Sequence, residues 1–302
     1  MVGIWGPVAL AAGTIALGSA SPWGSRVLRR RFRSGTAVRR GMVGGYGALA
    51  LLSVLCGGSR TDYGEYCLAA LAAALVATMA VLGSAAITPT DAPHRRRVVL
   101  AIGAHPDDLE LACGGTLARF VDIGHEVHGV IMTSGSQGGD ASRRPDEARR
   151  GARFMGLQSL AVHDFPDANL PLVQRELTRV IEEAIAAYGP DVILTHSAHD
   201  QHQDHLAVHE ATLRAARSSH SILCFESPSV TRDFNPSVYF DIHDYVDVKV
   251  SAVASHRDQA GKRYLDRDAL QGTATFRGAQ VRRRHAEGFE VVRLLADEAG
   301  VF

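Results

Sequence analysis

Three apolar runs stand out at the start of the chain, at residues 4–20, 41–58 and 66–88. None of them contains Asp, Glu, Lys or Arg, and each approaches the roughly 20 residues that a helix needs to cross a bilayer. The pattern therefore predicts a membrane region over residues 1–94 with about three transmembrane helices. Buried or interfacial helices packed on the rest of the protein are the alternative reading of the same pattern.

From residue 97 onward, short β-branched runs alternate with amphipathic segments, which is typical of a parallel sheet covered by helices. We expect strands at 98–103, 127–135, 160–165, 191–196 and 222–227, with an edge strand at 239–242. Helices are expected at 110–122, 145–155, 173–188 and 204–216, and again at the end of the chain. This predicts an α/β domain over residues 95–302, with a Rossmann-like, mostly parallel sheet and helices on both faces.

Charge refines this picture. The chain has 32 basic and 32 acidic residues, so nothing in its net charge indicates a nucleic-acid partner. Seven arginines, however, lie between the first two apolar runs: Arg26, Arg29, Arg30, Arg31, Arg33, Arg39 and Arg40. Because basic residues favour the cytoplasmic side, we expect a multi-pass membrane protein whose catalytic domain is cytoplasmic, with the lipid bilayer as a partner.

The four cysteines form no CxxC pair, which excludes the common zinc-finger spacing. Cys56 and Cys67 flank a short polar segment between two apolar runs. They would be able to form a disulfide if that segment faced an oxidising compartment.

Two polar clusters follow predicted strands. The first, His105-Pro106-Asp107-Asp108, comes directly after the strand at 98–103. A His and two carboxylates in a turn that Pro106 stiffens are suited to binding a metal. Alternatively, Asp107 or Asp108 caps the helix that follows.

The second cluster, at residues 196–205, holds four His and two Asp directly after the strand at 191–196. Ligands of open α/β sheets bind beyond the carboxyl ends of the strands, so two such clusters predict one joint metal site. His205 and His209 have the i, i+4 spacing of a helical ligand pair, but no Glu adjoins His205. We favour His205 alone as the third ligand, because two His and one carboxylate leave a position open for water.

The segments AHPDDLELACGGT at 104–116 and HDQHQDH at 199–205 resemble the PIG-L (LmbE-like) deacetylase family. Weaker similarity extends over about residues 97–292, including TSGSQGG at 133–139, DFPDANLP at 164–171, HRDQ at 256–259 and HAEGF at 285–289. Gln203 stands where many members have Pro. The first 90 residues lie outside the resemblance.

The resemblance implies a role for each matching residue. His105, Asp108 and His205 would hold a divalent metal, usually zinc, with iron(II) as the alternative. Asp107 would be the general base that activates the metal-bound water, and Arg144 would bind substrate. His202, cationic and oriented by Asp204, would stabilise the oxyanion and protonate the leaving amine.

The implied reaction is hydrolysis of the N-acetyl group of an N-acetylated sugar containing N-acetylglucosamine, and a membrane tether favours a glycolipid as substrate. Two other functions remain open on the sequence. The metal site would serve equally for an ester or a non-sugar amide, since the motifs specify the water rather than the acyl donor. The third possibility is a non-catalytic membrane protein that binds a glycan.

Overall fold

The computed structural model describes residues 5–57, 64–87 and 95–295. The chain divides into two compact units, Met1–Thr88 and Pro89–Phe302, and each has its own hydrophobic core.

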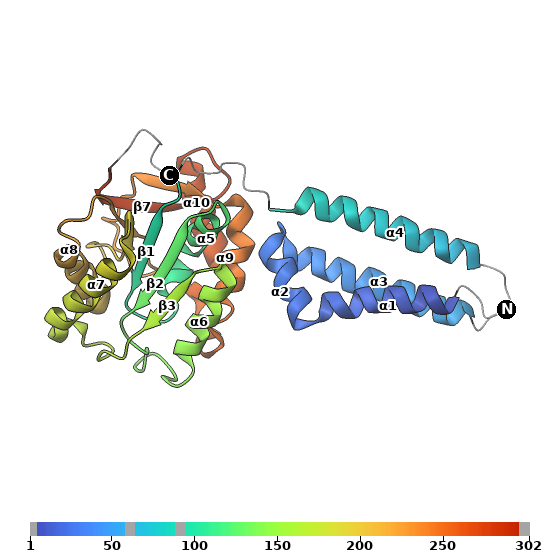
Figure 1. The fold of residues 1–302 in the computed structure, drawn as a ribbon, viewed down its shortest axis with the longest axis horizontal. Helices are drawn as coiled ribbons and strands as arrows, with labels where there is room; N and C mark the ends of the chain where they lie inside the picture. The colour runs from blue at the N-terminus through green and yellow to red at the C-terminus, as the bar shows by residue number, and fades with distance from the viewer. Residues whose placement is uncertain (1–4, 58–63, 88–94, 296–302) are drawn as a thin grey trace. The chain divides into compact units, whose positions relative to one another are not determined.

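The described part of the N-terminal unit is helical, with α1 (Trp5–Ala20), α2 (Pro22–Arg31), α3 (Gly35–Gly57) and α4 (Gly64–Ala85). Helices α1, α3 and α4 lie side by side, and α2 lies at one end of them (Figure 1). Their shared core consists mainly of small side chains around Tyr46 and Leu71. The Tyr46 hydroxyl is 3.1 Å from the carbonyl oxygen of Ala74 and 2.7 Å from the Thr78 hydroxyl, which links α3 to α4.

The arginine-rich connection is largely helical, which the sequence did not predict. Ser21 caps α2 by accepting a hydrogen bond from the Gly24 amide, and Pro22 occupies the first turn, where a missing N–H costs nothing. After α2, the Arg33 amide donates to the Ala85 carbonyl (2.7 Å). The basic connection is therefore fastened to the carboxyl end of α4.

One helix among the described residues is long and apolar enough to cross a membrane, Leu68–Ala85, with a mean hydropathy of 2.1 and only 6% of it buried. The run at 4–20 gives a shorter apolar helix, Gly6–Ala20, and the run at 41–58 lies in α3, whose first half contains Arg39 and Arg40 among glycines. The structure thus supports one candidate span, and the expectation of three is not supported. The proposed pairing of Cys56 with Cys67 lies outside the described residues, because the Cys67 side chain is not among them.

The second unit is built on a mixed, mostly parallel seven-stranded sheet in the order β3-β2-β1-β4-β5-β7-β6, which confirms the predicted fold class. Its strands are β1 (Val98–Gly103), β2 (Glu126–Ile131), β3 (Ser159–Val162), β4 (Val192–Thr195), β5 (Ile222–Phe225), β6 (Val238–Asp241) and β7 (Ala286–Arg293). β1 to β5 pair in parallel. β1, β4 and β5 are almost entirely buried, as expected of strands covered on both faces.

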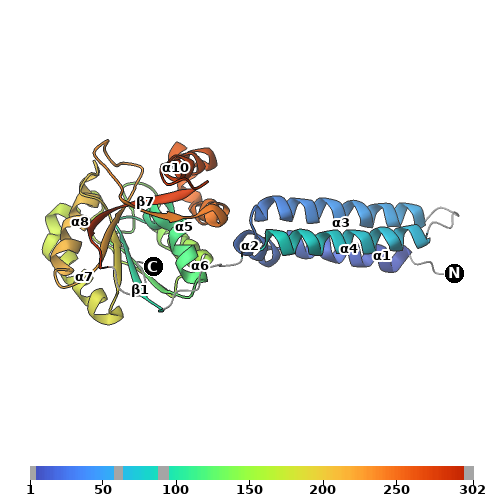
Figure 2. The ribbon, with the colours of Figure 1, turned by 90° about the horizontal axis from the view of Figure 1, so that it is seen from above.

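Helices cover both faces of this sheet, with α7 and α8 on one face and α5 and α6 on the other (Figure 2). The main core joins β1, β2 and β4 to α7 and α8 through Leu100, Val130, Ile193, Leu177 and Val208. The helices are α5 (Asp108–Asp122), α6 (Arg144–Met155), α7 (Gln174–Tyr188), α8 (Gln203–Ala215), α9 (Val246–Val253) and α10 (Arg267–Gln280). Short 3₁₀ turns lie at Leu170–Val173, His243–Tyr245, Arg257–Gln259 and Arg263–Leu265.

The carboxyl end of the chain differs from the expectation of terminal helices. After α10 the chain forms β7, which lies between β5 and β6 and is antiparallel to both. The edge strand predicted at 239–242 is present as β6.

Helix α5 is broken at Cys113, whose φ and ψ are −136° and 18°. Gly115 follows at a close contact: a Cβ there would lie 2.9 Å from Cδ1 of Ile242. The amides of Gly115 and Thr116 donate to the two carboxylate oxygens of Glu287 in β7 (3.1 and 2.7 Å) instead of continuing the helix. A side chain of β7, near the carboxyl end of the chain, therefore accepts the hydrogen bonds of the amides at the break in α5.

Candidate metal centre

The two polar clusters meet because β1 and β4 are neighbours in the sheet. His105 to Asp108 follow the end of β1, and residues 196–202 connect β4 to α8. The sheet changes its winding direction between these two strands, which is where ligands bind in open α/β sheets. Gly103 makes the turn possible, since a Cβ there would lie 2.9 Å from Cδ1 of Ile131 and 3.1 Å from the Asp108 side chain.

His105, Asp108 and His205 direct three possible ligand groups toward one point. Nδ1 of His105 is 3.3 Å from Nε2 of His205. The Asp108 carboxylate approaches both nitrogens, with Oδ2 3.6 Å from Nδ1 of His105 and Oδ1 3.5 Å from Nε2 of His205. Ligands about 2.1 Å from a tetrahedral zinc ion are about 3.4 Å apart. These separations therefore fit a single divalent metal.

The outer nitrogens of both imidazoles are held by carboxylates. Nε2 of His105 donates to Asp204 (3.1 Å), and Nδ1 of His205 donates to Asp200 (2.9 Å). A carboxylate only accepts, so these outer nitrogens carry the hydrogens. In the neutral rings the inner nitrogens then present lone pairs to each other, which is the arrangement of metal-binding histidines.

The electrostatic surroundings favour a positive charge at the same point. Burial disfavours the charged ring of His105, but the carboxylates of Asp108, Asp167 and Asp204 outweigh burial and raise the pKa of His105 well above its usual value. Burial also disfavours ionised Asp108, yet His205 and His196 hold the pKa of Asp108 well below its usual range. An ionised carboxylate and an environment selective for a cation are both requirements of a metal centre.

Asp107 has an unusual backbone conformation, with φ 115°. It occupies the N-cap position of α5, but its side chain makes no capping hydrogen bond, so the capping alternative does not account for it. A non-glycine residue in this region costs on the order of 1–3 kcal/mol. Burial, together with the Asp108 carboxylate, raises the pKa of Asp107 to about 6.

Arg144 is buried beside Asp107 at the start of α6. Its guanidinium donates to the carbonyls of Gly135 (2.7 Å) and Pro106 (2.9 Å) and lies 3.4 Å from the Asp107 carboxylate. Arg144 therefore fastens the loop after β2 to the loop after β1. It also lines a cavity beside these residues, and its role in substrate binding stays a prediction.

The Asp204 carboxylate does not orient His202, contrary to the expectation from sequence. The Asp204 side chain accepts from the amides of Ala168 and Leu170 and holds His105, while its backbone amide donates to Nδ1 of His202 (3.2 Å). This amide leaves the hydrogen of a neutral His202 on Nε2. Burial and the nearby rings of His205 and His105 lower the pKa of His202, which favours the neutral form over the cation expected from sequence.

His209 is turned away from the three ligand groups, since its Nδ1 donates to the His196 carbonyl (2.8 Å). His196, which the sequence did not single out, contacts two of the three possible ligands. Its Nε2 is 3.1 Å from Asp108, and its ring stacks on His205 at 3.9 Å between centroids. The sequence also missed Asp200, although it stood within the second cluster.

A cavity of about 370 Å³ opens over these groups. Its walls include all the expected site residues except Asp204. Residues from four further segments, none of them among the expected site residues, complete the lining: Gln137, Asp167, Ser229, Lys262 and Tyr264. Burial and Asp107 raise the pKa of Tyr264 to about 12, so its phenol keeps the hydrogen and is available as a donor.

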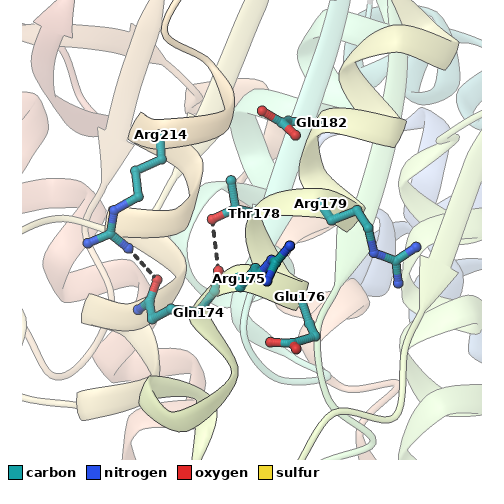
Figure 3. Close-up of a pocket in the computed structure, with 7 residues that line it drawn as sticks. All are labelled: Gln174, Arg175, Glu176, Thr178, Arg179, Glu182 and Arg214. Carbon is teal, nitrogen blue, oxygen red and sulfur yellow. Dashed lines mark hydrogen bonds between the residues drawn. The ribbon is translucent and has the colours of Figure 1, made fainter.

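Another hollow, of about 750 Å³, lies over α7 and α8 (Figure 3). It is lined by no histidine or cysteine. Two of its arginines are engaged, because Arg214 donates to Gln174 (2.7 Å) and Arg179 to Glu183 (2.9 Å). This hollow holds no group of acid–base or metal chemistry comparable to those at the strand ends.

Comparison with known proteins identifies the family of the chain. Residues 100–216 match the PIG-L family, described as GlcNAc-PI de-N-acetylase. An Escherichia coli protein named as the uncharacterized deacetylase YaiS is 34% identical over 171 residues, which cover 54% of this chain and 92% of that protein. The chain belongs to the PIG-L family.

Two further comparisons show proteins of similar sequence or fold. The diacetylchitobiose deacetylase of Thermococcus kodakarensis is 29% identical over 64% of this chain and 82% of its own length. The solved structure of N,N'-diacetylchitobiose deacetylase from Pyrococcus horikoshii has a TM-score of 0.57 at 24% identity, covering 65% of this chain and 84% of that one. At this identity the structural likeness shows the shared fold.

Proposed function

We propose that this PIG-L protein is a metal-dependent deacetylase that hydrolyses the N-acetyl group of a substrate containing N-acetylglucosamine. The observation that carries the proposal is the convergence of His105, Asp108 and His205 beside buried Asp107 in one cavity. Relatives named as deacetylases of diacetylchitobiose and of an N-acetylglucosaminyl malate support the substrate class.

The three convergent residues would hold zinc, with iron(II) as the alternative. A bound divalent ion supplies Lewis acidity and lowers the pKa of water that it binds. Asp107 accepts the proton of the attacking water, since burial places its pKa near neutrality, where a general base is most effective. Asp204 and Asp200 keep the inner nitrogens of His105 and His205 free of hydrogen.

His202 contributes a hydrogen-bond donor at the cavity wall. Its Nδ1 accepts from the Asp204 amide, so its Nε2–H is available to the oxygen that gains negative charge during hydrolysis. The proton taken by Asp107 is then available to the leaving amine, which must be protonated to depart. Arg144 fixes the loop that carries Asp107 and lines the substrate cavity.

The experiment that tests the activity measures released acetate and free amine from diacetylchitobiose and other N-acetylglucosamine conjugates, using the full chain loaded with zinc. We expect release that a chelator abolishes and that Asp107→Asn lowers by about 10²–10⁴-fold, the usual contribution of a general base. Asp146→Asn is the matched control, because Asp146 is an exposed carboxylate on α6. Release from acetyl esters but from none of the amides would indicate a different acyl substrate.

We further propose that the N-terminal unit lies in a lipid bilayer. Large apolar side chains are exposed along α1, α3 and α4, with Leu17 and Met79 each 75% exposed. Exposed apolar surface on this scale marks an interaction site, and α4 has the length and hydropathy of a membrane span. The arginine distribution still predicts a cytoplasmic catalytic domain.

Recovery of the full chain in the membrane fraction after a carbonate wash tests the attachment, and recovery in the supernatant would refute it.

A further inference from the structure

One wall of the cavity over the candidate metal centre comes from the segment between α9 and α10. Lys262 and Tyr264 of this segment both line the cavity. Nζ of Lys262 lies 6.0 Å from the centroid of the Tyr264 ring. Since the phenol keeps its hydrogen at a pKa of about 12, the wall presents two hydrogen-bond donors, an ammonium and a hydroxyl, beside each other.

Lys262 is held in this wall by its neighbours. Its side chain is half-buried, and its ammonium donates to the carbonyl of Gly138 (3.4 Å) and to the side-chain oxygen of Gln259. The side-chain nitrogen of Gln259 donates to the same carbonyl (3.3 Å) and to Asp258 (2.7 Å). Asp258 also accepts the amide of Asp140 (3.1 Å). The ammonium is therefore positioned before a substrate binds, which lowers the entropy cost of binding to it.

The charge of Lys262 is not paired within the chain. Both of its acceptors are uncharged, and no carboxylate among the described residues forms an ion pair with it. The chain has only one other lysine, Lys249, which is buried in its ion pair with Glu287. Arg144, the other Lys or Arg of the cavity lining, lies 3.4 Å from the Asp107 carboxylate. The charge of Lys262 is thus available to a ligand in the cavity.

The carboxylates of the cavity do not need this charge. The lining contains three of them, Asp107, Asp108 and Asp167. Arg144 offsets the charge of Asp107, and a divalent ion in the proposed site would offset the other two. The positive charge of Lys262 then remains in excess, and complementary charge favours an anionic ligand at this wall.

We propose that the substrate carries an anionic group beside its N-acetylglucosamine, a phosphate ester or a carboxylate, and that Lys262 and Tyr264 bind this group. The inference rests on the proposed deacetylase function and names the substrate class of the same site. The ammonium and the phenol each donate to an oxygen of the anion, and hydrogen bonds to a charged acceptor are stronger than those between neutral groups. Lys262 is thus a specificity-determining residue.

Two matched pairs of substrates test the role of charge. N-acetylglucosaminyl malate is compared with its uncharged dimethyl ester, and the methyl phosphodiester of N-acetylglucosamine with its uncharged methyl glycoside. Released free amine is measured with the zinc-loaded full chain, so that cleavage of an ester does not count. We expect kcat/KM to favour the charged member of at least one pair about tenfold, mainly through KM, as for one hydrogen bond to a charged group. The favoured pair distinguishes a phosphate ester from a carboxylate.

Three variants assign the preference to this wall. Lys262→Met removes the charge and keeps an apolar side chain, and it should abolish the preference. Tyr264→Phe removes one donor and leaves the charge, so it should lower the preference by less. Arg263→Met is the matched control, because it removes a positive charge at the neighbouring exposed position, which does not line the cavity. This control should keep the preference of the wild type.

Binding is read separately by calorimetry on zinc-loaded Asp107→Asn, in which turnover is slow. The charged member of the favoured pair should bind about tenfold more tightly than the uncharged one. The addition of Lys262→Met should make the two affinities equal. This measurement reports on the wall even where no amine is released.

Equal kcat/KM for both members of both pairs would overturn the proposal. A preference that persists in Lys262→Met would place the anion elsewhere, for example at the metal, and would also overturn it. So would an equal loss by Lys262→Met on charged and uncharged substrates, because it would assign Lys262 to holding the Gly138 loop. No amine release from any of the four compounds would instead refute the deacetylase function for these conjugates, and the calorimetry would then decide whether the wall binds an anion.

Discussion

Lys249 and Glu287 form an ion pair with 2.6 Å between Nζ and a carboxylate oxygen, and both side chains are buried. The pair sits at the break in α5, because Glu287 accepts the amides of Gly115 and Thr116. α5 begins at Asp108, a predicted metal ligand. This ion pair thus joins α9 and the carboxyl-terminal strand β7 to the helix that carries part of the candidate site.

Removing one partner of this pair should destabilise the catalytic unit strongly. Glu287→Ala leaves the Lys249 ammonium and two backbone amides buried without the carboxylate, and breaking a buried pair in this way costs about 3–5 kcal/mol. The loss is measurable by urea unfolding of the full chain. Glu183→Ala is the control, since Glu183 forms an exposed i, i+4 pair with Arg179 that is worth less than about 1 kcal/mol. Similar midpoints for the two variants would contradict the structural role given to Glu287.

Asp200 should control metal affinity without contacting the metal. It accepts from Nδ1 of His205 and from the hydroxyls of Ser227 and Ser229. Burial disfavours the ionised carboxylate, but the bonds from His205 and Ser227 outweigh burial and keep the pKa of Asp200 below its usual range. Asp200→Ala should weaken zinc binding about 10–100-fold, as measured by competition with a chromogenic chelator. Asp233→Ala removes an exposed carboxylate that does not line the cavity and should leave the affinity unchanged. Equal affinities of the two variants would show that His205 needs no such partner.

The parts of the site that the sequence predicted are those that local pattern encodes. His105 and Asp108 follow the buried strand β1, and His205 lies in the first turn of α8, the helix that follows β4. Because β1 and β4 are neighbours in the sheet, the three residues come together. The support around them was not predictable in the same way. Ser227 and Ser229 reach Asp200 from the end of a third strand, and nothing in their local sequence distinguishes them from ordinary loop serines.

The carboxyl-terminal strand shows the same limit. β7 takes its place in the sheet through pairing with β5 and β6, and its partners lie tens of residues away in sequence. Its outer residues Val291 and Val292 remain partly exposed, so its pattern lacks the continuous burial that identified β1. Non-local pairing overrides weak local preference here.

His256 should make stability depend on pH. Burial disfavours the charged ring of His256. Three nearby carboxylates outweigh burial and raise the pKa of His256: Glu110 in α5, Asp107 just before α5, and Glu147 in α6. Nε2 of His256 lies 3.3 Å from Glu110. Because the folded pKa exceeds the unfolded value, this contribution is fully present below the unfolded pKa of roughly 6.5 and is lost as pH rises through the folded pKa.

This pH dependence is checked by urea unfolding of the metal-free wild-type protein and of His256→Gln, measured from acidic to alkaline pH. We expect the variant to lose more stability at acidic than at alkaline pH, relative to the wild type. His220→Gln is the matched control. Because His220 is exposed, its substitution should change stability neither at acidic nor at alkaline pH. A His256 variant whose deficit is the same at all pH values would show that the ring is neutral in the folded protein.

Metal removal should lower the melting temperature without unfolding the domain. The three convergent residues lie on the loops and first helical turns beyond β1 and β4, while the main core is formed by apolar residues of β1, β2, β4, α7 and α8. A metal that binds only the folded state stabilises it by about 4 kcal/mol at 1,000 times its dissociation constant. Added zinc should therefore raise the melting temperature of chelated protein in a concentration-dependent manner.

Asp108→Asn is the decisive variant for this titration. In the wild type the Asp108 carboxylate accepts a hydrogen bond from the backbone N–H of His105 at 2.7 Å. The side-chain oxygen of the introduced Asn can still accept this bond, but the Asn side chain lacks the negative charge that a divalent ion requires. Its melting temperature should rise little with zinc, whereas that of Asp146→Asn should rise as in the wild type. An equal rise in all three proteins would mean that the stabilising zinc binds elsewhere, and a chelated wild type without a cooperative transition would mean that the metal is needed for folding itself.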